Sequence, residues 1–294
     1  MLMSTNKVSV IIPSINEPYL TQTIRDVLLK AAGEVEVIAI IDGKYPEEEV
    51  DDKRVKYRHF QDGFETGHGK RQCMNAGALI ATGKYFFFLD AHCMVCEGFD
   101  EILKADCDDN WIVTPRRYKL DPEKWAILED GKGAVDYMYL CYPPRNPNKT
   151  TIDGFPWRER AIQRLNIEVD DDMINQGSAC FMTSQHFFRM GFMDVKHFGG
   201  NFQESQETCL KTWLSGGRVV RNKKTWYAHW RKRHRGWDLD MVAVQPYLDY
   251  STDLWMNNRD WPGKIYDLEW LINKFWPVPT WPKNWTEDWK RRNG

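Results

Sequence analysis

The sequence has no hydrophobic run long enough to cross a membrane and no strong excess of either charge. None of its 294 residues belongs to an apolar stretch of about 18 residues, the minimum for a transmembrane helix. Forty Lys and Arg residues nearly balance 42 Asp and Glu residues, so the net charge of −2 gives no global reason to expect a nucleic-acid or membrane partner. Residues 1–7 lack the apolar core of a signal peptide. We therefore expect a cytoplasmic protein without a membrane partner.

A disulfide framework and internal repeats are also missing. The seven cysteines are an odd number scattered through apparent strands and helices, which favours reduced thiols. Cys93 and Cys96 have the spacing of half a zinc ribbon, but no second pair follows them. We interpret both as core cysteines rather than zinc ligands.

An apolar run that ends in an acid and a histidine is the most informative stretch. Five large apolar residues, 85–89, precede Asp90-Ala91-His92, and such a run is typical of a short strand buried on both faces. Because side chains alternate along a strand, Asp90 and His92 project to the same side. A carboxylate and a neutral imidazole suit Mn²⁺, which can carry a diphosphate. The alternative is an Asp90 that caps a turn and a His92 on the surface.

Strands and helices alternate in the N-terminal part of the chain. Apolar runs at 8–13 and 34–43 predict two strands, and the spacing over 21–32 predicts a helix between them. This order predicts a right-handed βαβ unit with ligands beyond the carboxyl ends of the strands. The polar residues expected at those ends, where a carboxylate can accept from a base N–H or a ribose hydroxyl, are Asn16, Glu17 and Asp42.

Further along, the pattern becomes less regular. We expect strands at 55–60, 111–115 and 218–221, separated by a long turn-rich insert over 116–172. The acid run from Asp170 to Asp172 in this insert is expected to be a solvated loop.

The segment Phe88-Leu89-Asp90-Ala91-His92-Cys93 resembles the metal-binding segment of the polypeptide N-acetylgalactosaminyltransferases and, more loosely, the Asp-x-Asp segment of family 2 glycosyltransferases. Both groups have a GT-A fold, so the resemblance, which spans roughly 7–258, implies an α/β protein with a Rossmann-like mixed sheet flanked by helices. In these families the equivalents of Asn16, Glu17 and Asp42 line the pocket for the base and ribose of a uridine diphosphate.

Two further segments resemble the donor site of these families. Residues 67–78 are similar to the Gly-Lys-x-x-x-x-Asn-x-Gly helix, which implies that Lys70 or Arg71 faces a diphosphate. Residues 176–182 are similar to the Gly-Gly-x-Phe-Ala segment, which implies that Gly177 leaves room for the donor sugar.

The segment 226–235 resembles a His-x-x-Arg-Lys-x-His run that completes the metal shell and continues into a lid. The resemblance implies that His229 is the third metal ligand after Asp90 and His92. It also implies that three basic residues neutralise the leaving diphosphate, namely Arg231, Arg233 and His234. A polar loop and a nucleic-acid patch are the alternatives for this run.

Residues 197–217 resemble the family segment Trp-Gly-Gly-Glu-Asn-x-Glu, with three extra residues after Gly200. Aligned backward from Gly216, Glu204 and Glu207 match the two family glutamates. Their spacing predicts one helical face, although acids in a first turn can also simply complement the helix dipole. Ser205 follows Glu204 where inverting enzymes carry an aspartate base. Because serine is a poor base, we expect retention of configuration, with Glu204 positioning the acceptor or stabilising an oxocarbenium-like transition state.

Ten of the fourteen tryptophans lie between Trp226 and Trp289, interleaved with prolines. So much aromatic surface argues against disorder and predicts a C-terminal arm, 236–294, packed on a catalytic domain of residues 1–235. An aromatic platform for the acceptor is the alternative.

Together these features predict a metal-dependent glycosyltransferase, with Mn²⁺ or Mg²⁺ as cofactor and a UDP-sugar as donor. The expected acceptor is a macromolecule, either a hydroxymethylated pyrimidine in DNA or a protein Ser/Thr, and a bacterial or viral intracellular enzyme fits the composition. The alternative is a non-catalytic protein that binds sugar nucleotides or nucleic acid.

Overall fold

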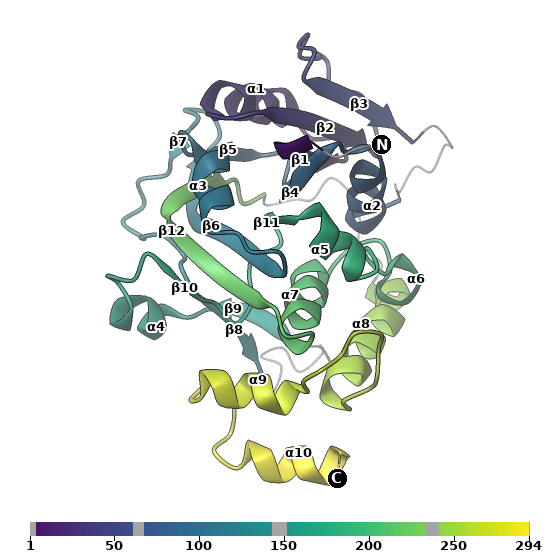
Figure 1. Cartoon of the computed structure of the whole chain (residues 1–294), viewed down its shortest axis with the longest axis vertical. Helices are drawn as coiled ribbons and strands as arrows, with labels where there is room; N and C mark the ends of the chain where they lie inside the picture. The colour runs from purple at the N-terminus through teal and green to yellow at the C-terminus, as the bar shows by residue number, and fades with distance from the viewer. Residues whose placement is uncertain (1–3, 61–67, 143–151, 233–240, 294) are drawn as a thin grey trace.

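A mixed β-sheet flanked by helices organises the chain (Figure 1). The computed structural model describes residues 4–60, 68–142, 152–232 and 241–293. The strands are β1 (Ser4–Ser14), β2 (Val35–Ile41), β3 (Val55–His59), β4 (Gly83–Leu89), β5 (Cys93–Val95), β6 (Trp111–Asp121), β7 (Ala126–Ile127), β8 (Met138–Cys141), β9 (Asp153–Pro156), β10 (Val169–Asp171), β11 (Ala179–Thr183) and β12 (Arg218–His229). The helices are α1 (Leu20–Lys30), α2 (Lys70–Ile80), α3 (Phe99–Ala105), α4 (Arg158–Gln163), α5 (Ser184–Arg189), α6 (Val195–Phe198), α7 (Glu204–Leu214), α8 (Met241–Met256), α9 (Leu268–Phe275) and α10 (Trp285–Asn293).

The strand order along the sheet is β10-β12-β6-β11-β4-β1-β2-β3. β1 pairs in parallel with β2, as the βαβ pattern predicts. β1 also pairs in parallel with β4, and β2 with β3. β11 runs antiparallel to β4 and β6, while β12 is parallel to β6. The carboxyl ends of β1, β2, β4 and β12 therefore lie along one edge of the sheet, together with the start of β11.

Both faces of the sheet are buried. Alternate residues of β1 and β2 belong to two different hydrophobic clusters, one shared with α2, α5 and α7 and the other with α1 and α3. All seven residues of β2 are buried, which explains the continuous apolar sequence from Val37 to Ile41. The one charged residue of β2, Glu36, pairs with Lys56 at 2.7 Å. This two-sided burial fixes the strand ends rigidly and so fixes the side chains that follow them.

β6 and β12 are longer than the sequence pattern predicts. They pair in parallel from Arg218–Trp111 to His229–Lys119, with a register shift after the Pro115–Asn222 pair. Proline cannot donate a ladder hydrogen bond, so it is tolerated in a strand next to such an irregularity. The expectation that the first strand stops at Pro115 is therefore wrong, and both strands continue to the edge of the sheet.

The acid run is structural rather than solvated, so the expectation of a loop is wrong. Asp172 is fully buried, pairs with Arg221 at 2.8 Å and accepts the backbone N–H of Met138. Burial raises the pKa of Asp172 to about 6. Asp170 pairs with Arg164, and the equally buried guanidinium of Arg221 explains why an acid is required inside the fold.

The C-terminal segment packs on the rest of the molecule. Residues of α9 and α10 belong to the same hydrophobic cluster as Trp213 of α7, and the tryptophans 255, 281, 285 and 289 are between 2% and 6% exposed. This burial supports the packed arm rather than an aromatic platform, and α9 and α10 lie at one end of the molecule (Figure 1). The boundary after residue 235 stays a prediction, because residues 233–240 lie outside the described part of the chain.

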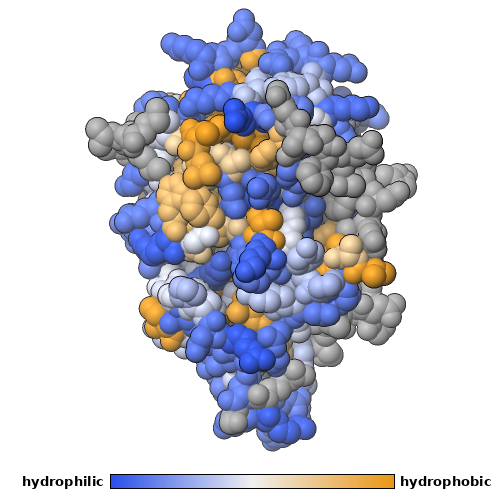
Figure 2. All heavy atoms as spheres, turned by 90° about the vertical axis from the view of Figure 1, so that its right-hand side faces the viewer, coloured by the Kyte–Doolittle hydropathy of each residue, from blue (hydrophilic) through white to orange (hydrophobic). Residues whose placement is uncertain are grey.

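The surface on the side that carries α2, α6 and α8 is mostly hydrophilic, with an apolar patch in its upper half (Figure 2). In the described ranges, no helix has the length and apolar character needed to span a membrane.

Candidate active site

A cleft of about 520 Å³ opens at the edge of the sheet where the carboxyl ends of the strands meet. Open α/β sheets bind ligands at this edge, because the strand ends present loops and helix N-termini there. Segments far apart in the sequence line the cleft, and its lining residues are Pro13, Ser14, Ile15, Glu17, Asp42, Gly69, Lys70, Cys73, Asp90, Ala91, His92, Arg117, Gln176, Gly177, Ser178, Asn201, Phe202, Glu204, His229, Arg231 and Lys232.

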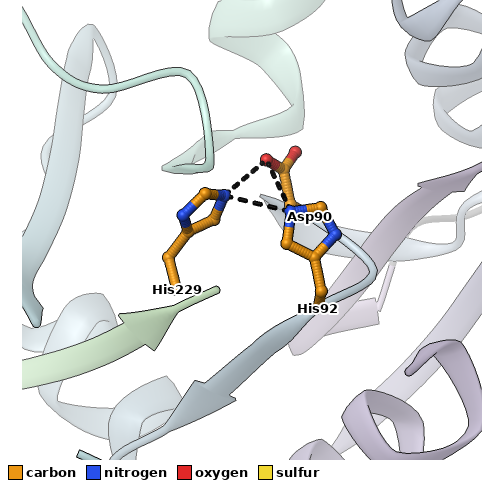
Figure 3. A group of neighbouring side chains, drawn as sticks. All are labelled: Asp90, His92 and His229. Atoms are coloured by element: carbon orange, nitrogen blue, oxygen red, sulfur yellow. Dashed lines mark hydrogen bonds and ion pairs between the residues drawn. The ribbon is translucent and has the colours of Figure 1, made fainter. Parts of the chain in front are cut away.

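Asp90, His92 and His229 converge in this cleft (Figure 3). Asp90 and His92 follow β4, and His229 is the last residue of β12. One ligand atom from each of the three lies within 4.8 Å of the others. The Nε2 atom of His229 is 3.3 Å from Asp90 Oδ2 and 3.1 Å from His92 Nε2. The backbone thus brings together three residues that are up to 139 positions apart.

The pKa values of Asp90 and His229 suit metal binding. Burial would raise the pKa of the Asp90 carboxyl, but the Lys70 ammonium and the two imidazoles hold it well below its usual range. Burial lowers the pKa of His229 to about 4, so its imidazole is neutral at pH 7. One carboxylate oxygen and two imidazole nitrogens form a donor set that fits a divalent cation such as Mn²⁺.

Glu17 supports the imidazole of His92 from behind. Its Oε2 lies 3.1 Å from His92 Nδ1, which leaves Nε2 directed at Asp90 and His229. A carboxylate on the second nitrogen of a ligating histidine fixes both the tautomer and the ring orientation. The other Glu17 oxygen pairs with Lys232, and although burial raises the pKa of Glu17, the contacts with His92 and Lys232 lower it overall.

Lys70 ties the metal-site aspartate to the loop before β11. Its Nζ donates to Asp90 Oδ1 and to the Gly177 carbonyl, both at 2.5 Å. Burial lowers the pKa of Lys70, but Asp90 outweighs this and raises it to about 12. The ammonium therefore remains charged and partly exposed to the cleft, where it can meet an anion.

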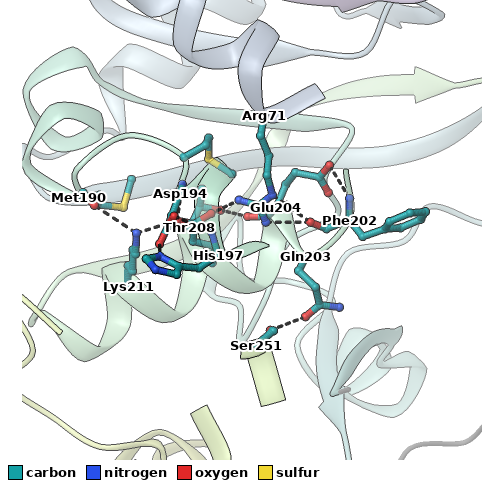
Figure 4. A network of polar contacts seen from close by, with 12 residues as sticks. Arg71, Met190, Asp194, His197, Phe202, Gln203, Glu204, Thr208, Lys211 and Ser251 are labelled. Atoms are coloured by element: carbon teal, nitrogen blue, oxygen red, sulfur yellow. Dashed lines mark hydrogen bonds and ion pairs between the residues drawn. The ribbon is translucent and has the colours of Figure 1, made fainter. Parts of the chain in front are cut away.

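Arg71, the second basic candidate for the diphosphate, does not line the cleft and belongs instead to a network of polar contacts around α7 (Figure 4). Its side chain is fully buried, forms an ion pair with Glu207 and donates to the Phe202 carbonyl at 2.8 Å and 3.2 Å. Glu207 is also fully buried. Its carboxylate accepts from Lys211 at 2.6 Å and from the backbone N–H of Asp194 at 3.0 Å.

The two glutamates of α7 therefore do not share one exposed face. Glu204 lines the cleft, whereas Glu207 holds α7 to the start of α2 through Arg71. The physical reason is the buried guanidinium of Arg71, which requires a carboxylate inside the protein.

The polar residues after β1 and β2 are largely occupied by their own chain. Asp42 lines the cleft but accepts the backbone N–H groups of His68 and Gly69, both at 2.7 Å. Asn16 accepts from the backbone of Lys44 at 2.9 Å and lines a neighbouring hollow of about 760 Å³ rather than the cleft.

Gly177, Glu204 and Arg231 all line the cleft. A Cβ added at Gly177 would lie 3.1 Å from Ser205 Oγ, so the helix that carries Glu204 approaches this glycine closely. Arg233 and His234 lie outside the described residues.

The sequence interpretation missed Arg117, Gln176 and Lys232, which also line the cleft. Arg117 contacts His229 Nδ1 at 3.2 Å and Gln176 Oε1. Two consecutive arginines directly after an apolar strand are the available signal, but the prediction that the strand ends at Pro115 separates them from the sheet. Lys232 lies in the basic run after His229, from which the family resemblance selects only Arg231, Arg233 and His234 as candidates.

Comparison with known proteins places this geometry in a family. Residues 9–160, just over half of the chain, match the family model of glycosyl transferase family 2. The chain belongs to glycosyl transferase family 2. The matched span contains most of β1, all of β2 and β4, and the Asp90–His92 segment.

This family 2 chain is 29% identical over 209 residues to a putative polypeptide N-acetylgalactosaminyltransferase 13 of Drosophila melanogaster, covering 67% of this chain and 33% of the relative. It is 27% identical over 150 residues to a probable N-acetylgalactosaminyltransferase 8 of Caenorhabditis elegans, covering 48% and 32%. The chain therefore spans about a third of the length of these curated relatives.

A crystal structure of GalNAc-T7 with UDP, GalNAc and Mn²⁺ has the same fold, with a TM-score of 0.66 at 18% identity, covering 92% of this chain and 56% of that one. The expected GT-A fold, a mixed sheet flanked by helices, is confirmed.

The expected cytoplasmic location, with a bacterial or viral type of enzyme, is wrong. The curated relatives of this family 2 chain are animal N-acetylgalactosaminyltransferases, and their sequences are about three times longer than the part it matches. The expectation of a cytoplasmic location relied on the lack of a membrane-spanning run and of a signal-peptide core in the 294 residues, and the relatives do not support it.

Proposed function

We propose that this chain is a metal-dependent glycosyltransferase that transfers a sugar from a UDP-sugar to an acceptor hydroxyl. The observation that carries the proposal is the convergence of Asp90, His92 and His229 in the cleft at the strand ends. We propose Mn²⁺ or Mg²⁺ as the cofactor, and the fold shared with GalNAc-T7, solved with UDP and Mn²⁺, supports this choice. The names of the curated relatives favour an N-acetylhexosaminyl or hexosyl group as the sugar. Residues 1–235 would form the catalytic domain.

The position of each residue in the cleft suggests its role in binding the donor. A bound divalent cation supplies Lewis-acid stabilisation of the departing diphosphate. Lys70 adds a positive charge beside Asp90, and Arg231 adds another at the rim. Glu17 holds the His92 ring, and Asp42 lies where a base or ribose would bind. We keep Arg233 and His234 as further candidates for the diphosphate, in the segment directly after Lys232.

Glu204 would serve the sugar and the acceptor. It lies beside Gly177, which is small enough to leave room for a sugar, and Oε1 accepts the backbone N–H of Phe202 at 3.0 Å. Ser205 follows it, so this position offers no carboxylate base to deprotonate an attacking hydroxyl. We propose that Glu204 positions the acceptor or stabilises positive charge on the sugar, and that configuration is retained.

The anomeric configuration of the product tests this mechanism. We expect the product to keep the α configuration of an α-linked UDP-sugar donor, because no acid follows Glu204 to act as the base of an inverting displacement. Proton NMR of the fresh product, recorded before mutarotation or secondary hydrolysis, gives the anomeric coupling constant directly. A product with inverted configuration would refute retention while leaving the transferase proposal intact.

The acceptor is proposed to be a macromolecule that carries a hydroxyl, either a hydroxymethylated pyrimidine in DNA or a protein Ser/Thr. A pyrimidine inside a duplex would have to be flipped out to reach the cleft, which costs a few kcal/mol and favours single-stranded DNA. Protein acceptors carry no such cost. Mass spectrometry of both kinds of acceptor after incubation with donor distinguishes them.

Ligand-induced stabilisation tests the donor. We expect a UDP-sugar to raise the melting temperature in the presence of Mn²⁺ and to have a much smaller effect in EDTA, because ligands that bind only the folded state stabilise it by mass action. ADP- and GDP-sugars at the same concentration serve as controls for the base. Stabilisation that is independent of metal, together with no turnover and tight DNA binding, would instead favour a non-catalytic binding protein.

A further inference from the structure

Arg117 brings a positive charge into the cleft without an acid beside it. Its Nη2 lies 3.2 Å from His229 Nδ1, and its Nη1 donates to Gln176 Oε1. Neither contact supplies a negative charge, because one partner is an imidazole and the other a side-chain amide. Within residues 4–60, 68–142, 152–232 and 241–293, Arg117 forms no ion pair, and its buried Nε has no hydrogen-bond partner.

The other cations near this point are already neutralised or solvated. Lys70 pairs with Asp90, and Lys232 pairs with Glu17. Arg231 is exposed, so water solvates its charge. Desolvating a cation without a counter-charge is costly, so the half-buried Arg117 indicates a ligand that supplies the negative charge.

The ring of His229 separates Arg117 from the metal site. Nε2 of this histidine faces Asp90 and His92, whereas Nδ1, on the other side of the imidazole, faces Arg117. An anion held by Arg117 would therefore lie apart from a metal-bound diphosphate. It would lie instead next to Gln176 and Gly177, where the sugar is proposed to bind and the acceptor must approach.

We propose that Arg117, together with the Gln176 amide, binds a phosphate or carboxylate of the acceptor close to the hydroxyl that receives the sugar. The planar guanidinium can hold such an oxyanion through two parallel hydrogen bonds, and the amide of Gln176 adds a neutral donor. The acceptor is accordingly an anionic molecule. This inference rests on the proposed glycosyltransferase function.

Binding of inorganic phosphate to protein saturated with UDP and Mn²⁺ tests the inference, because the diphosphate site is then filled. We expect isothermal titration calorimetry to detect phosphate binding to the wild type, and Arg117→Met to weaken it by about tenfold or more. Arg117→Lys should retain part of the affinity, since it keeps the charge but loses the paired donors.

Arg116→Met is the matched control, because Arg116 is the adjacent residue of β6 and its guanidinium is engaged by Asp136 at 2.6 Å and 3.0 Å. It should bind phosphate like the wild type when both proteins are saturated with UDP and Mn²⁺. Phosphate binding that ignores Arg117, or no phosphate binding, overturns the proposal. UDP binding that stays weaker in Arg117→Met at saturating Mn²⁺ also overturns it, because Arg117 would then hold the donor diphosphate rather than act through His229.

A donor comparison separates the two sources of the oxyanion. If the acceptor supplies it, wild type and Arg117→Met should show the same ratio of affinities for UDP-glucuronic acid and UDP-glucose. A preference for UDP-glucuronic acid that disappears in Arg117→Met would assign the oxyanion to the donor sugar and refute an acceptor subsite. If the protein binds no UDP, the proposed function fails, and phosphate titration of the nucleotide-free variants still decides the role of Arg117.

Discussion

Asp90→Ala should lose metal-dependent sugar transfer, with turnover falling by on the order of 10³-fold or more. Asp90 supplies the carboxylate of the three-residue cluster and accepts from Lys70 at 2.5 Å, so its loss removes one metal ligand and the partner of a cleft cation. A metal that stabilises a leaving diphosphate contributes several kcal/mol, and each 1.4 kcal/mol, roughly, is tenfold in rate. Turnover of UDP-sugar, as transfer or as hydrolysis, is the primary measurement.

A direct measurement of metal binding distinguishes this role from a general loss of structure. Calorimetry should show that Asp90→Ala binds Mn²⁺ much more weakly, while its melting temperature in EDTA stays near that of the wild type. Asp90→Asn keeps the size of the side chain and should show the same loss through charge alone. Asp52→Ala removes a carboxylate paired with Arg54 outside the cleft and serves as the control. Full activity in Asp90→Ala would remove the metal assignment.

The strand-end chemistry around Asp90 could be predicted because it is local. A buried strand of known direction fixes which side chains emerge together, and five apolar residues before Asp90 identify such a strand. The parallel pairing of β1 and β2 followed from the apolar spacing of two strands with a helix between them. The prediction that His229 lies beside Asp90 and His92 rests on the family resemblance. The apolar pattern of β12 alone does not indicate which strand ends lie next to its own.

The long-range contacts of charged residues could not be predicted. Arg71 and Lys70 are neighbours in a short polar segment, yet one is fully buried and the other lines the cleft. The difference depends on Glu207, which is 136 positions away along the chain. The prediction of a solvated loop at 170–172 is wrong for the same reason. Asp172 is held inside the fold by an ion pair with Arg221, which lies on another strand.

Arg117 is absent from the predicted site because the strand that carries it is predicted to end too early. A strand that ends at Pro115 places Arg117 in a turn-rich insert, where its position relative to the sheet cannot be inferred from the sequence. The continuation of β6 beside β12 pairs Arg117 with Tyr227, two residues before His229. The signal that a proline can lie inside a strand was its position at a register shift, which only the tertiary pairing reveals.

Glu207→Gln should destabilise the fold strongly, whereas Glu204→Gln should leave the stability nearly unchanged and reduce turnover. Glu207 and Arg71 form a fully buried ion pair, so removing the negative charge leaves a buried guanidinium uncompensated, at a cost of about 3–5 kcal/mol. Glutamine keeps the size of the side chain and an oxygen for the Asp194 amide, which isolates the effect of charge. Urea unfolding of the two variants gives the free energies directly.

The two variants are matched, because they make the same substitution in the same first turn of α7. Glu204 faces the cleft and its carboxylate accepts one backbone N–H, so its loss should change the free energy of unfolding by less than about 1 kcal/mol. Replacing both Arg71 and Glu207 by apolar residues should recover part of the stability lost in Glu207→Gln, since no buried charge remains. If Glu207→Gln instead unfolds like the wild type and only its turnover falls, Glu207 acts on the substrate, and the assignment of both glutamates to one catalytic face would be restored.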